Sequence, residues 1–342
     1  MKPLCPYFGK CGGCELQHIE YPIQLENKKK TLQRAINFEN IEVFSGYDYF
    51  YRNRLDVLFH KKGIGLRRKD RPGEIINIER CVICTEKVNS IITDMQKFFT
   101  ENDTRTFRSA IIRASDFDNA VFFNLDHLRL KGAINKIGEF NAKNIVVNTG
   151  NSVFPLKGNI FVREKLNKKS FYYYSGGFFQ NNTKMAEKMI QYSRKILEKY
   201  DTKDAQLIDL YGGVGTFGIS NADLFKKITV VENSRESVAC AKMNNRKIEA
   251  IALDASKIKR LKLLPKLFMI TDPPRSGMDQ KTINTIKELK PEVIIYISCN
   301  PRQLEKDIKK FSKYKIESAA LFDLFPQTNH IEAVVELKIN CA

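Results

Sequence analysis

Two kinds of hydrophobic pattern divide the chain. Between about residues 50 and 175, short runs rich in β-branched and aromatic residues are separated by Gly and Asn, which predicts a small, mainly antiparallel sheet with a few helices. From residue 205 onward, apolar runs such as AQLIDL, ITVVEN and VIIYIS alternate with segments of helical length. This alternation is typical of an α/β fold with a doubly wound, mostly parallel sheet. Residues 18–40 carry apolar positions at helical spacing beside a basic face and are predicted to form a helix.

Composition and charge narrow the class of protein. The chain has 342 residues, of which 43% are hydrophobic and 28% charged, so it has room for two globular domains. Its net charge of +18 is spread over both halves and favours a polyanionic partner. Residues 49–71 (YFYRNRLDVLFHKKGIGLRRKDR) mix aromatics with Arg and Lys, as RNA-binding surfaces do, although a solvated basic hairpin would read the same way.

The location follows from what the sequence does not contain. No apolar run approaches the ~18 residues of a membrane span, and the segment MKPLCPYFGK does not have the apolar centre of a signal peptide. We therefore expect a cytoplasmic protein with no membrane partner, whose eight cysteines are reduced.

Three cysteines near the start predict a metal site. Cys5, Cys11 and Cys14 are spaced C-x5-C-x2-C, and the segment RCVIC offers Cys81 or Cys84 as a fourth ligand. Four thiolates suit either zinc or a [4Fe–4S] cluster. Zinc ribbons usually have two close pairs, so three ligands plus a distant one favour iron–sulfur. Unrelated reduced thiols are the remaining alternative.

A glycine-rich turn after the first strand of the C-terminal half predicts a nucleotide-like cofactor. Gly213, Gly215 and Gly218 form G-x-G-x-x-G, and Glu232 ends the next strand at the spacing of a ribose-binding acid. The turn alone fits a dinucleotide or S-adenosylmethionine equally well. Residues 272–275 (DPPR) place an acid and two prolines at a carboxyl strand end, which favours S-adenosylmethionine and a flat heterocyclic substrate.

A cysteine at the next strand end raises a question about catalysis. The strand VIIYIS runs into Cys299, and Asn300-Pro301 stops it. Strand periodicity alone favours a buried, inert cysteine. Its place at the tip, after the DPPR segment, makes Cys299 a candidate nucleophile.

Together these motifs resemble the RNA uracil-C5 methyltransferases, in particular the members that carry an N-terminal iron–sulfur cluster. The resemblance spans nearly the whole chain through the cysteine motif, GGFFQNN (176–182), DLYGGVGTF (209–217), VVEN (230–233), DPPRSG (272–277), SCNP (298–301) and DLFPQTNHIE (323–332). The sequence departs from the family at Gly212, where Cys is common, and at Gln327, where His is usual. We expect the change at Gly212 to matter little. RQLEKD also stands where T-L-A-R-D is more familiar.

The resemblance implies a Rossmann-like class I methyltransferase domain, with Cys299 as the nucleophile toward uracil C6 and Glu332 as the general base. Asp272 would lie at the cofactor site, between cofactor and base, and hydrogen-bond the uracil. The other residues that the family places around S-adenosylmethionine are Gln180, Tyr211, Glu232 and Asp254. By the same resemblance Cys81 is the fourth cluster ligand and Cys84 is spare.

The family also implies a layout. Residues 1–17 plus 47–176 would form a β-rich, iron–sulfur-bearing RNA-binding domain, and residues 18–46 plus 177–342 the methyltransferase domain. We expect a monomer. Because some members add an RNA-binding β-barrel before the cysteines and this sequence begins at them, we expect a 23S rRNA uridine as the target rather than the tRNA T-loop uridine.

Three other functions stay open at this point. An RNA cytosine-C5 methyltransferase would also use a thiolate, but usually has a Pro-Cys pair where this chain has DPP. A nicotinamide enzyme would leave Cys299 and Glu332 without a role. An iron–sulfur RNA-binding protein without catalysis would need the basic segment and the cysteines but no nucleophile.

Overall fold

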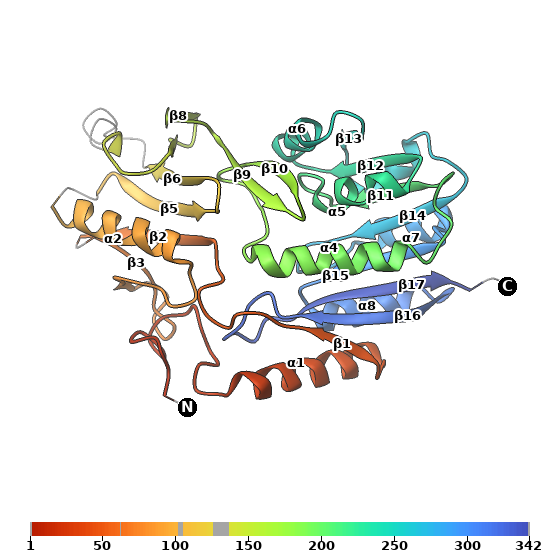
Figure 1. Ribbon diagram of the computed structural model, residues 1–342, viewed down its shortest axis with the longest axis horizontal. Helices are drawn as coiled ribbons and strands as arrows, with labels where there is room; N and C mark the ends of the chain where they lie inside the picture. Colours follow the sequence, from red (N-terminus) through yellow and green to blue (C-terminus); the bar gives the residue numbers. More distant parts are fainter. Residues whose placement is uncertain (1, 62, 102–104, 126–136, 341–342) are drawn as a thin grey trace.

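The computed structural model describes residues 2–61, 63–101, 105–125 and 137–340. Lys62 of the basic segment and Cys341 lie outside these ranges. A large sheet with helices on both faces lies beside a smaller sheet, and a two-stranded hairpin stands between them (Figure 1). Within the described ranges, no helix combines the length and the apolar character needed to cross a membrane.

The large sheet has eight strands in the order β1-β16-β17-β15-β14-β11-β12-β13. Its parallel part comprises β11 (Gln206–Leu210), β12 (Lys227–Glu232), β13 (Glu249–Ala252), β14 (Leu267–Thr271) and β15 (Val293–Ser298). The strands β16 (Tyr314–Phe322) and β17 (Glu332–Ile339) pair with each other in antiparallel fashion, and β17 also runs antiparallel to β15. β1 (Ile41–Phe44) pairs in parallel with β16 and forms the edge. The doubly wound, mostly parallel sheet is confirmed.

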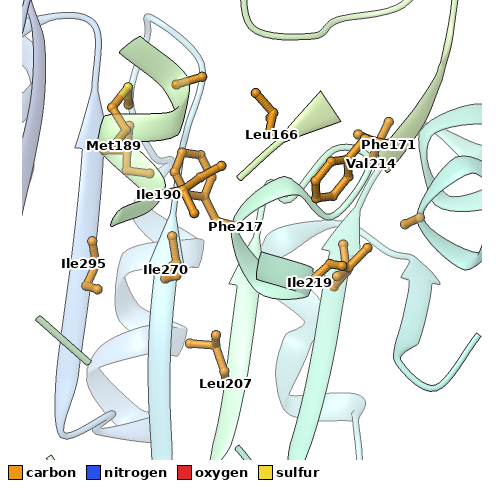
Figure 2. Close-up of a cluster of buried hydrophobic side chains, with 14 of the residues drawn as sticks. Leu166, Phe171, Met189, Ile190, Leu207, Val214, Phe217, Ile219, Ile270 and Ile295 are labelled. Atoms are coloured by element: carbon orange, nitrogen blue, oxygen red, sulfur yellow. The ribbon is translucent and has the colours of Figure 1, made fainter. Parts of the chain in front are cut away.

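Both faces of this sheet are buried, which explains why its strands are almost continuously apolar. Leu207, Ile270 and Ile295 point to one face and pack with α4 (Thr183–Leu197) and α5 (Thr216–Ser220), as Figure 2 shows. The neighbouring strand residues point to the opposite face, where they pack with side chains of α1, α7 and α8. These helices and α6 have the bounds α1 Tyr21–Ile36, α6 Arg235–Asn244, α7 Gln280–Leu289 and α8 Pro301–Lys310; two short 3-10 turns, η1 and η2, span Ala222–Leu224 and Ala255–Arg260.

The smaller sheet has seven strands in the order β4-β3-β2-β5-β6-β7-β8. Their bounds are β2 Arg54–His60, β3 Gly63–Arg67, β4 Ile75–Asn77, β5 Phe107–Ala114, β6 Asn119–Leu125, β7 Asn144–Asn148 and β8 Val153–Lys157. All neighbours are antiparallel except β6 and β7. One face packs on α2 (Glu86–Glu101), with Val57, Ile92 and Phe123 in the shared core. The mainly antiparallel sheet expected for this region is present.

The hairpin differs from the expectation. The sequence predicts a single small sheet over about residues 50–175. In the structure, however, β9 (Phe161–Leu166) and β10 (Lys169–Tyr174) pair only with each other among the described strands. Leu166 and Phe171 enter the same core as Val214 and Phe217 of the large sheet's first turn and helix (Figure 2). An alternating apolar pattern predicts a strand, but it does not say which sheet the strand's apolar face will meet.

Candidate active site

Five side chains singled out from the sequence stand at one edge of the large sheet. Tyr211, Glu232, Asp254, Asp272 and Cys299 lie at or just after the carboxyl ends of β11, β12, β13, β14 and β15, respectively. These strands are parallel and hydrogen-bonded in continuous register, so their ends meet. The carboxyl edge of an open α/β sheet is where ligands bind. The fold therefore brings these five residues into one region.

The glycine-rich turn fixes Glu232. Gly213 and Gly215 have φ of 55° and 82°, in the left-handed region that glycine adopts without steric cost. This turn directs the Gly213 amide to Glu232 Oε2 at 3.1 Å. The other carboxylate oxygen accepts from the amides of Asn233 (2.8 Å) and Ser234 (2.9 Å). Glu232 is thereby held in one orientation at the strand end.

Asp209 lies behind the same turn and was not singled out from the sequence. Its Oδ2 accepts from the Gly218 amide at 2.7 Å, and its Oδ1 has no hydrogen-bond partner among the described residues. Burial raises its pKa to about 7, Gly218 counteracts this, and Glu232 adds to it. A Cβ at Gly212 would lie 2.8 Å from Asp209 Cγ and Val230 Cγ1. A side chain at position 212 would therefore require its neighbours to shift.

Tyr211 and Asp254 are close to each other across the strand ends. Tyr211 has a φ of 59°, and its hydroxyl shares a hydrogen bond with Thr282. Burial raises the Tyr211 pKa to about 12, and the Asp279 and Asp254 carboxylates raise it further against the Thr282 contact. Asp254 caps the turn η2 by accepting from the Ser256 amide at 2.9 Å. A fixed aromatic ring and a fixed carboxylate thus belong to the same edge of the sheet.

Gln180 belongs to a different part of the fold. It lies in the loop between β10 and α4, with a buried side chain, and its carbonyl accepts from Asn53 Nδ2 at 3.2 Å. Buried Arg113 of the small sheet holds the same loop: its Nε donates to the Ser175 carbonyl at 3.0 Å, and its terminal nitrogen donates to the Gly177 carbonyl. The small sheet therefore sets the main-chain position of the loop that carries Gln180.

Cys299 and Glu332 meet because β17 runs antiparallel beside β15. Ser298 at the end of β15 is opposite Ala333 at the start of β17, so the residues just outside this pair are neighbours. Burial, together with the carboxylates of Glu332 and Asp272, raises the pKa of the Cys299 thiol to about 11. Only the Arg275 side chain and a backbone N–H act in the opposite direction.

The two carboxyl groups at this site are also perturbed. Burial raises the pKa of Glu332 well above its ordinary value, Asp272 adds to the rise, and Arg275 opposes it. Burial likewise raises the pKa of Asp272 to about 7, with a further contribution from Asp209. A thiol and two carboxyls with raised pKa values at one edge of the sheet form a centre for nucleophilic and proton-transfer chemistry.

The loop that carries Asp272 is held against the helix that follows Cys299. Asn300 Nδ2 donates to the Arg275 carbonyl at 3.0 Å. Fully buried Asp307 on α8 accepts from the Met278 amide at 3.0 Å and from the Tyr296 hydroxyl at 2.7 Å. Sequence reasoning assigned no role to Arg275 or Asp307. The spacing of Asp307 could have indicated its burial. It follows Leu304 by three positions, so both side chains lie on the buried face of this otherwise polar helix.

His330 contacts the same loop. Its Nδ1 lies 2.7 Å from a terminal nitrogen of Arg275, which donates the hydrogen bond because a guanidinium has no acceptor. Burial lowers the pKa of His330, and the positive charge of Arg275 lowers it further. His330 is therefore a neutral acceptor that orients Arg275 beside Cys299.

The four cysteines predicted as metal ligands also come together, although they are far apart in the chain. Burial is the largest cause that raises the thiol pKa values of Cys5, Cys11 and Cys14, and the neighbouring Cys81 sulfur raises each of them further. Cys81 differs, because a hydrogen bond from the Cys84 thiol lowers its pKa to about 7. The same contact and burial raise the pKa of Cys84, which acts as the proton donor.

Over the residues described, no three His, Cys, Asp or Glu side chains are gathered closely enough to hold a metal ion. N–H groups point at three of the four cysteine sulfurs: Tyr7 and Phe8 at Cys5, Gly13 at Cys11, and Ile83 and Cys84 at Cys81. Such donors are the usual second shell of sulfur ligands.

Comparisons with known proteins agree with this geometry. Residues 20–264 and 264–340 match the family model described as tRNA (Uracil-5-)-methyltransferase. The chain is 30% identical to a tRNA (uracil(54)-C(5))-methyltransferase and to a 23S rRNA (uracil(747)-C(5))-methyltransferase, both of Pyrococcus abyssi, covering 98% of this chain and 85% of each relative. It also superposes on the crystal structure of the Pyrococcus abyssi tRNA (uracil-54, C5)-methyltransferase in complex with S-adenosyl-L-homocysteine. The TM-score is 0.79 and the identity 28%, covering 96% of this chain and 86% of that one.

Proposed function

Because the chain belongs to the tRNA (uracil-5-)-methyltransferase family, we propose that it transfers the methyl group of S-adenosylmethionine to C5 of a uridine in structured RNA. The observation that carries the proposal is the meeting of Cys299, Glu332 and Asp272 at the carboxyl edge of the large sheet. A nicotinamide enzyme or a non-catalytic RNA-binding protein has no use for this combination.

Uracil C5 is a weak nucleophile, and the residues of the site supply what it needs. The Cys299 thiolate adds to C6, and the electron pair of the C5–C6 double bond moves onto C5 and the C4 carbonyl. C5 then takes the methyl group from the sulfonium. Glu332 removes the C5 proton, the C5–H electrons restore the double bond, and the Cys299 thiolate leaves. The overall reaction releases one proton.

The protonation states at rest suit this order of events. With a pKa of about 11, the Cys299 thiol keeps its proton until positive charge enters the site. Arg275 supplies one positive charge, and the sulfonium of S-adenosylmethionine would supply another. Glu332 must be ionised to act as a base, and the same positive charges favour its ionised form. Cofactor binding would therefore activate both groups together.

We assign the cofactor to the carboxyl ends of the four neighbouring strands β14, β11, β12 and β13. Glu232, held by three backbone amides, would accept hydrogen bonds from the ribose hydroxyls, and Asp254 would lie near the adenine. Tyr211 and Gln180 would line the same site, and Asp272 would lie between the cofactor and the uracil. The structural relative described above was solved with S-adenosyl-L-homocysteine, which is the product of such a methyl transfer.

A stacking platform for RNA lies near the cysteine-rich segment. Phe50 is 42% exposed and has a φ of 55°, which is rare for a bulky residue and often marks a functional position. The Arg80 guanidinium carbon lies 5.5 Å from the centre of its ring, and Tyr47 nearby in sequence is 82% exposed. Exposed aromatics beside cations stack on unpaired bases and attract phosphate. The net charge of +18 supports the same partner.

The four cysteines complete the proposal. Cys5, Cys11, Cys14 and Cys81 would hold a [4Fe–4S] cluster, and Cys84 would donate a hydrogen bond to the Cys81 sulfur. The cluster would tie residues 5–14 to residues 81–84 and thereby fix the Phe50 platform, whose amide donates to the Val82 carbonyl at 3.0 Å. Its contribution would be structural.

The relatives reported above are named for different target RNAs. One relative is named for tRNA uracil 54 and another for 23S rRNA uracil 747. A 23S rRNA uridine stays our sequence-based prediction. Mapping 5-methyluridine in the total RNA of a deletion strain tests it: the loss of one 23S rRNA site with an intact T-loop would agree, and the loss of the T-loop methyl group would assign the enzyme to tRNA.

The chemistry itself is tested by trapping. RNA containing 5-fluorouridine has no C5 proton for Glu332 to remove, so the protein and the RNA should stay covalently linked after methyl transfer. Cys299→Ala should abolish this adduct, whereas Cys240→Ala, which removes a buried thiol of α6, should retain it. RNA containing 5-fluorocytidine should give no adduct. An adduct that survives Cys299→Ala, or no adduct with the intact protein, would refute the mechanism.

A further inference from the structure

The loop that leads into Glu332 is held by distant parts of the chain. Residues 323–331 connect β16 to β17, and Glu332 follows directly. Lys28 Nζ donates to Asp323 Oδ1 at 2.6 Å in a buried ion pair, and Asn182 Nδ2 donates to the Leu324 carbonyl at 3.2 Å. The position of the loop therefore depends on elements that are far from it in sequence.

Gln327 is the centre of these contacts. It is 2% exposed and has a φ of 66°, and each of its four polar groups is hydrogen-bonded. The side-chain carbonyl of Gln327 accepts from Gln24 Nε2 at 2.9 Å, while the backbone N–H of Gln327 donates to Gln24 Oε1 at 3.2 Å. Its Nε2 donates to Asp48 Oδ2 at 3.2 Å. Its backbone carbonyl accepts from the amides of Glu15 (2.9 Å) and Leu16 (3.1 Å).

These partners belong to the cysteine-rich segment and the helix that follows it. Glu15 and Leu16 come directly after Cys14, and the Gln24 side chain also donates to the Leu16 carbonyl at 3.0 Å and the Ile19 carbonyl at 2.8 Å. Gln24 itself is 1% exposed. The Gln24–Gln327 amide pair thus joins the end of the cysteine motif to the loop before Glu332.

A second contact makes the same connection. The buried Tyr51 hydroxyl donates to the Pro326 carbonyl at 2.9 Å. The Tyr51 ring belongs to a small apolar cluster against which Cys5, Cys14 and Cys81 pack. Two adjacent residues of the loop, Pro326 and Gln327, are therefore anchored to the region that holds the four cysteines.

We propose that Gln327 is a positioning residue through which the cysteine-rich segment holds Glu332 in place for proton removal. The proposal rests on the proposed function, because it takes Glu332 as the base. The Gln24–Gln327 pair is buried, so losing one partner leaves unsatisfied polar groups and lets the loop move. Since Glu332 acts after methyl transfer, a displaced base would slow the release of RNA from Cys299 more than it slows adduct formation.

The kinetic test separates this role from a general loss of stability. With ordinary uridine RNA, Gln327→Ala and Gln24→Ala should each slow product release about tenfold, while the rate of covalent adduct formation changes little. The adduct, measured on denaturing gels, should accumulate during turnover. The double variant should be no slower than either single one, because both changes break the same pair.

Two further variants serve as controls. Gln33→Ala removes an exposed amide of the same helix, whose Nε2 donates to the Glu39 carbonyl at 2.7 Å, and should leave release unchanged. Gln327→His should restore much of the wild-type rate, because a neutral imidazole offers one acceptor for Gln24 and one donor for Asp48. A purely structural defect would slow adduct formation and release equally, and that outcome would overturn the proposal.

A second measurement does not depend on the chemistry. In hydrogen exchange of the full-length protein, Gln24→Ala should speed exchange in residues 14–17 and 323–331 but not in β15. Unchanged exchange in residues 323–331 would refute the coupling even if the enzyme is active. If the wild-type protein forms no adduct, the proposed function fails, and hydrogen exchange alone then decides whether the two segments are coupled.

Discussion

The half-buried Cys299 and the half-buried cysteines of the cysteine-rich segment have different polar neighbours. At the carboxyl edge of the large sheet, Cys299 faces Glu332 and Asp272, which add to the effect of burial and raise its pKa to about 11. In the cysteine-rich segment, N–H donors point at the sulfurs of Cys5, Cys11 and Cys81, and the Cys84 thiol lowers the pKa of Cys81 to about 7. Burial acts in the same direction in both places, but the polar neighbours do not.

The difference shows what each sulfur is suited to do. N–H donors stabilise permanent thiolates, which is what a metal ligand must be. Carboxylates keep a thiol protonated, which suits a nucleophile that should react only after the cofactor's positive charge has arrived. Residue type alone is the same in both groups, so the neighbours decide the chemistry.

The largest expected effect breaks the cysteine-rich side of this comparison. Cys81→Ser should prevent binding of the proposed iron–sulfur cluster, because it deletes the sulfur that faces the other three cysteines. Cys84→Ser, three residues away, should retain the cluster, since Cys84 only donates a hydrogen bond. Iron analysis and visible absorption of anaerobically purified proteins provide the measurement. Stoichiometric zinc without iron, or equal loss in both variants, would contradict the assignment.

The next effect concerns the carboxylate side. Glu332→Gln should still form the adduct with uridine RNA but release methylated product about 10²–10⁴-fold more slowly, as expected for loss of a general base. Glu317→Gln, which changes a carboxylate of β16 that pairs with Lys315, is the matched control and should turn over normally. Single-turnover kinetics separates the two steps. Rapid release by the Glu332 variant would remove it from the role of base.

A smaller effect tests the raised pKa of Cys299 directly. At pH 8 its alkylation by iodoacetamide should be about two orders of magnitude slower than that of a free cysteine, whose pKa is about 8.5. The rate of alkylation should rise with pH until about pH 11, where the thiol is half ionised. Glu332→Gln should lower the pKa and speed alkylation at pH 8, because it removes a carboxylate that opposes the thiolate. Mass spectrometry of the peptide containing Cys299 gives the rate. Alkylation at the rate of a free thiol would contradict the electrostatic picture.

The smallest expected effect tests whether the Phe50 platform, next to the cysteine-rich segment, binds RNA. Phe50→Ala should weaken RNA binding about tenfold, within the range for loss of one base–aromatic stack, and leave the rate of methyl transfer at saturating RNA unchanged. Phe117→Ala is the control, because it removes another exposed phenylalanine with nearby cations, Arg163 and Lys165, in the turn between β5 and β6. Equal losses in the two variants would assign binding to charge rather than to the Phe50 platform.

Much of the site was predictable because its residues follow local patterns. Strand ends with glycine, proline or acidic residues mark the carboxyl edge of a parallel sheet, so Glu232 and Asp272 could be placed together from sequence, whereas Tyr211 was indicated only by the family resemblance. Arg275, Asp307 and Asp209 could not be given roles in the same way. Their contacts join separate motifs, and no local spacing records which loop will lie against which helix.

By itself, the sequence determined the order of strands and helices, the alternation that makes a doubly wound sheet, and the candidates at each strand end, because these depend on hydrophobic periodicity and turn chemistry over a few residues. Only the tertiary structure decided that β17 lies between β15 and β16, so that Glu332 stands beside Cys299. It also decided that Gln24 meets Gln327, and which of Cys81 and Cys84 faces the other thiols. Pairing between distant segments and the loss of water around a buried group arise only when the whole chain is packed, and these two effects set the proton affinity of every reactive side chain here.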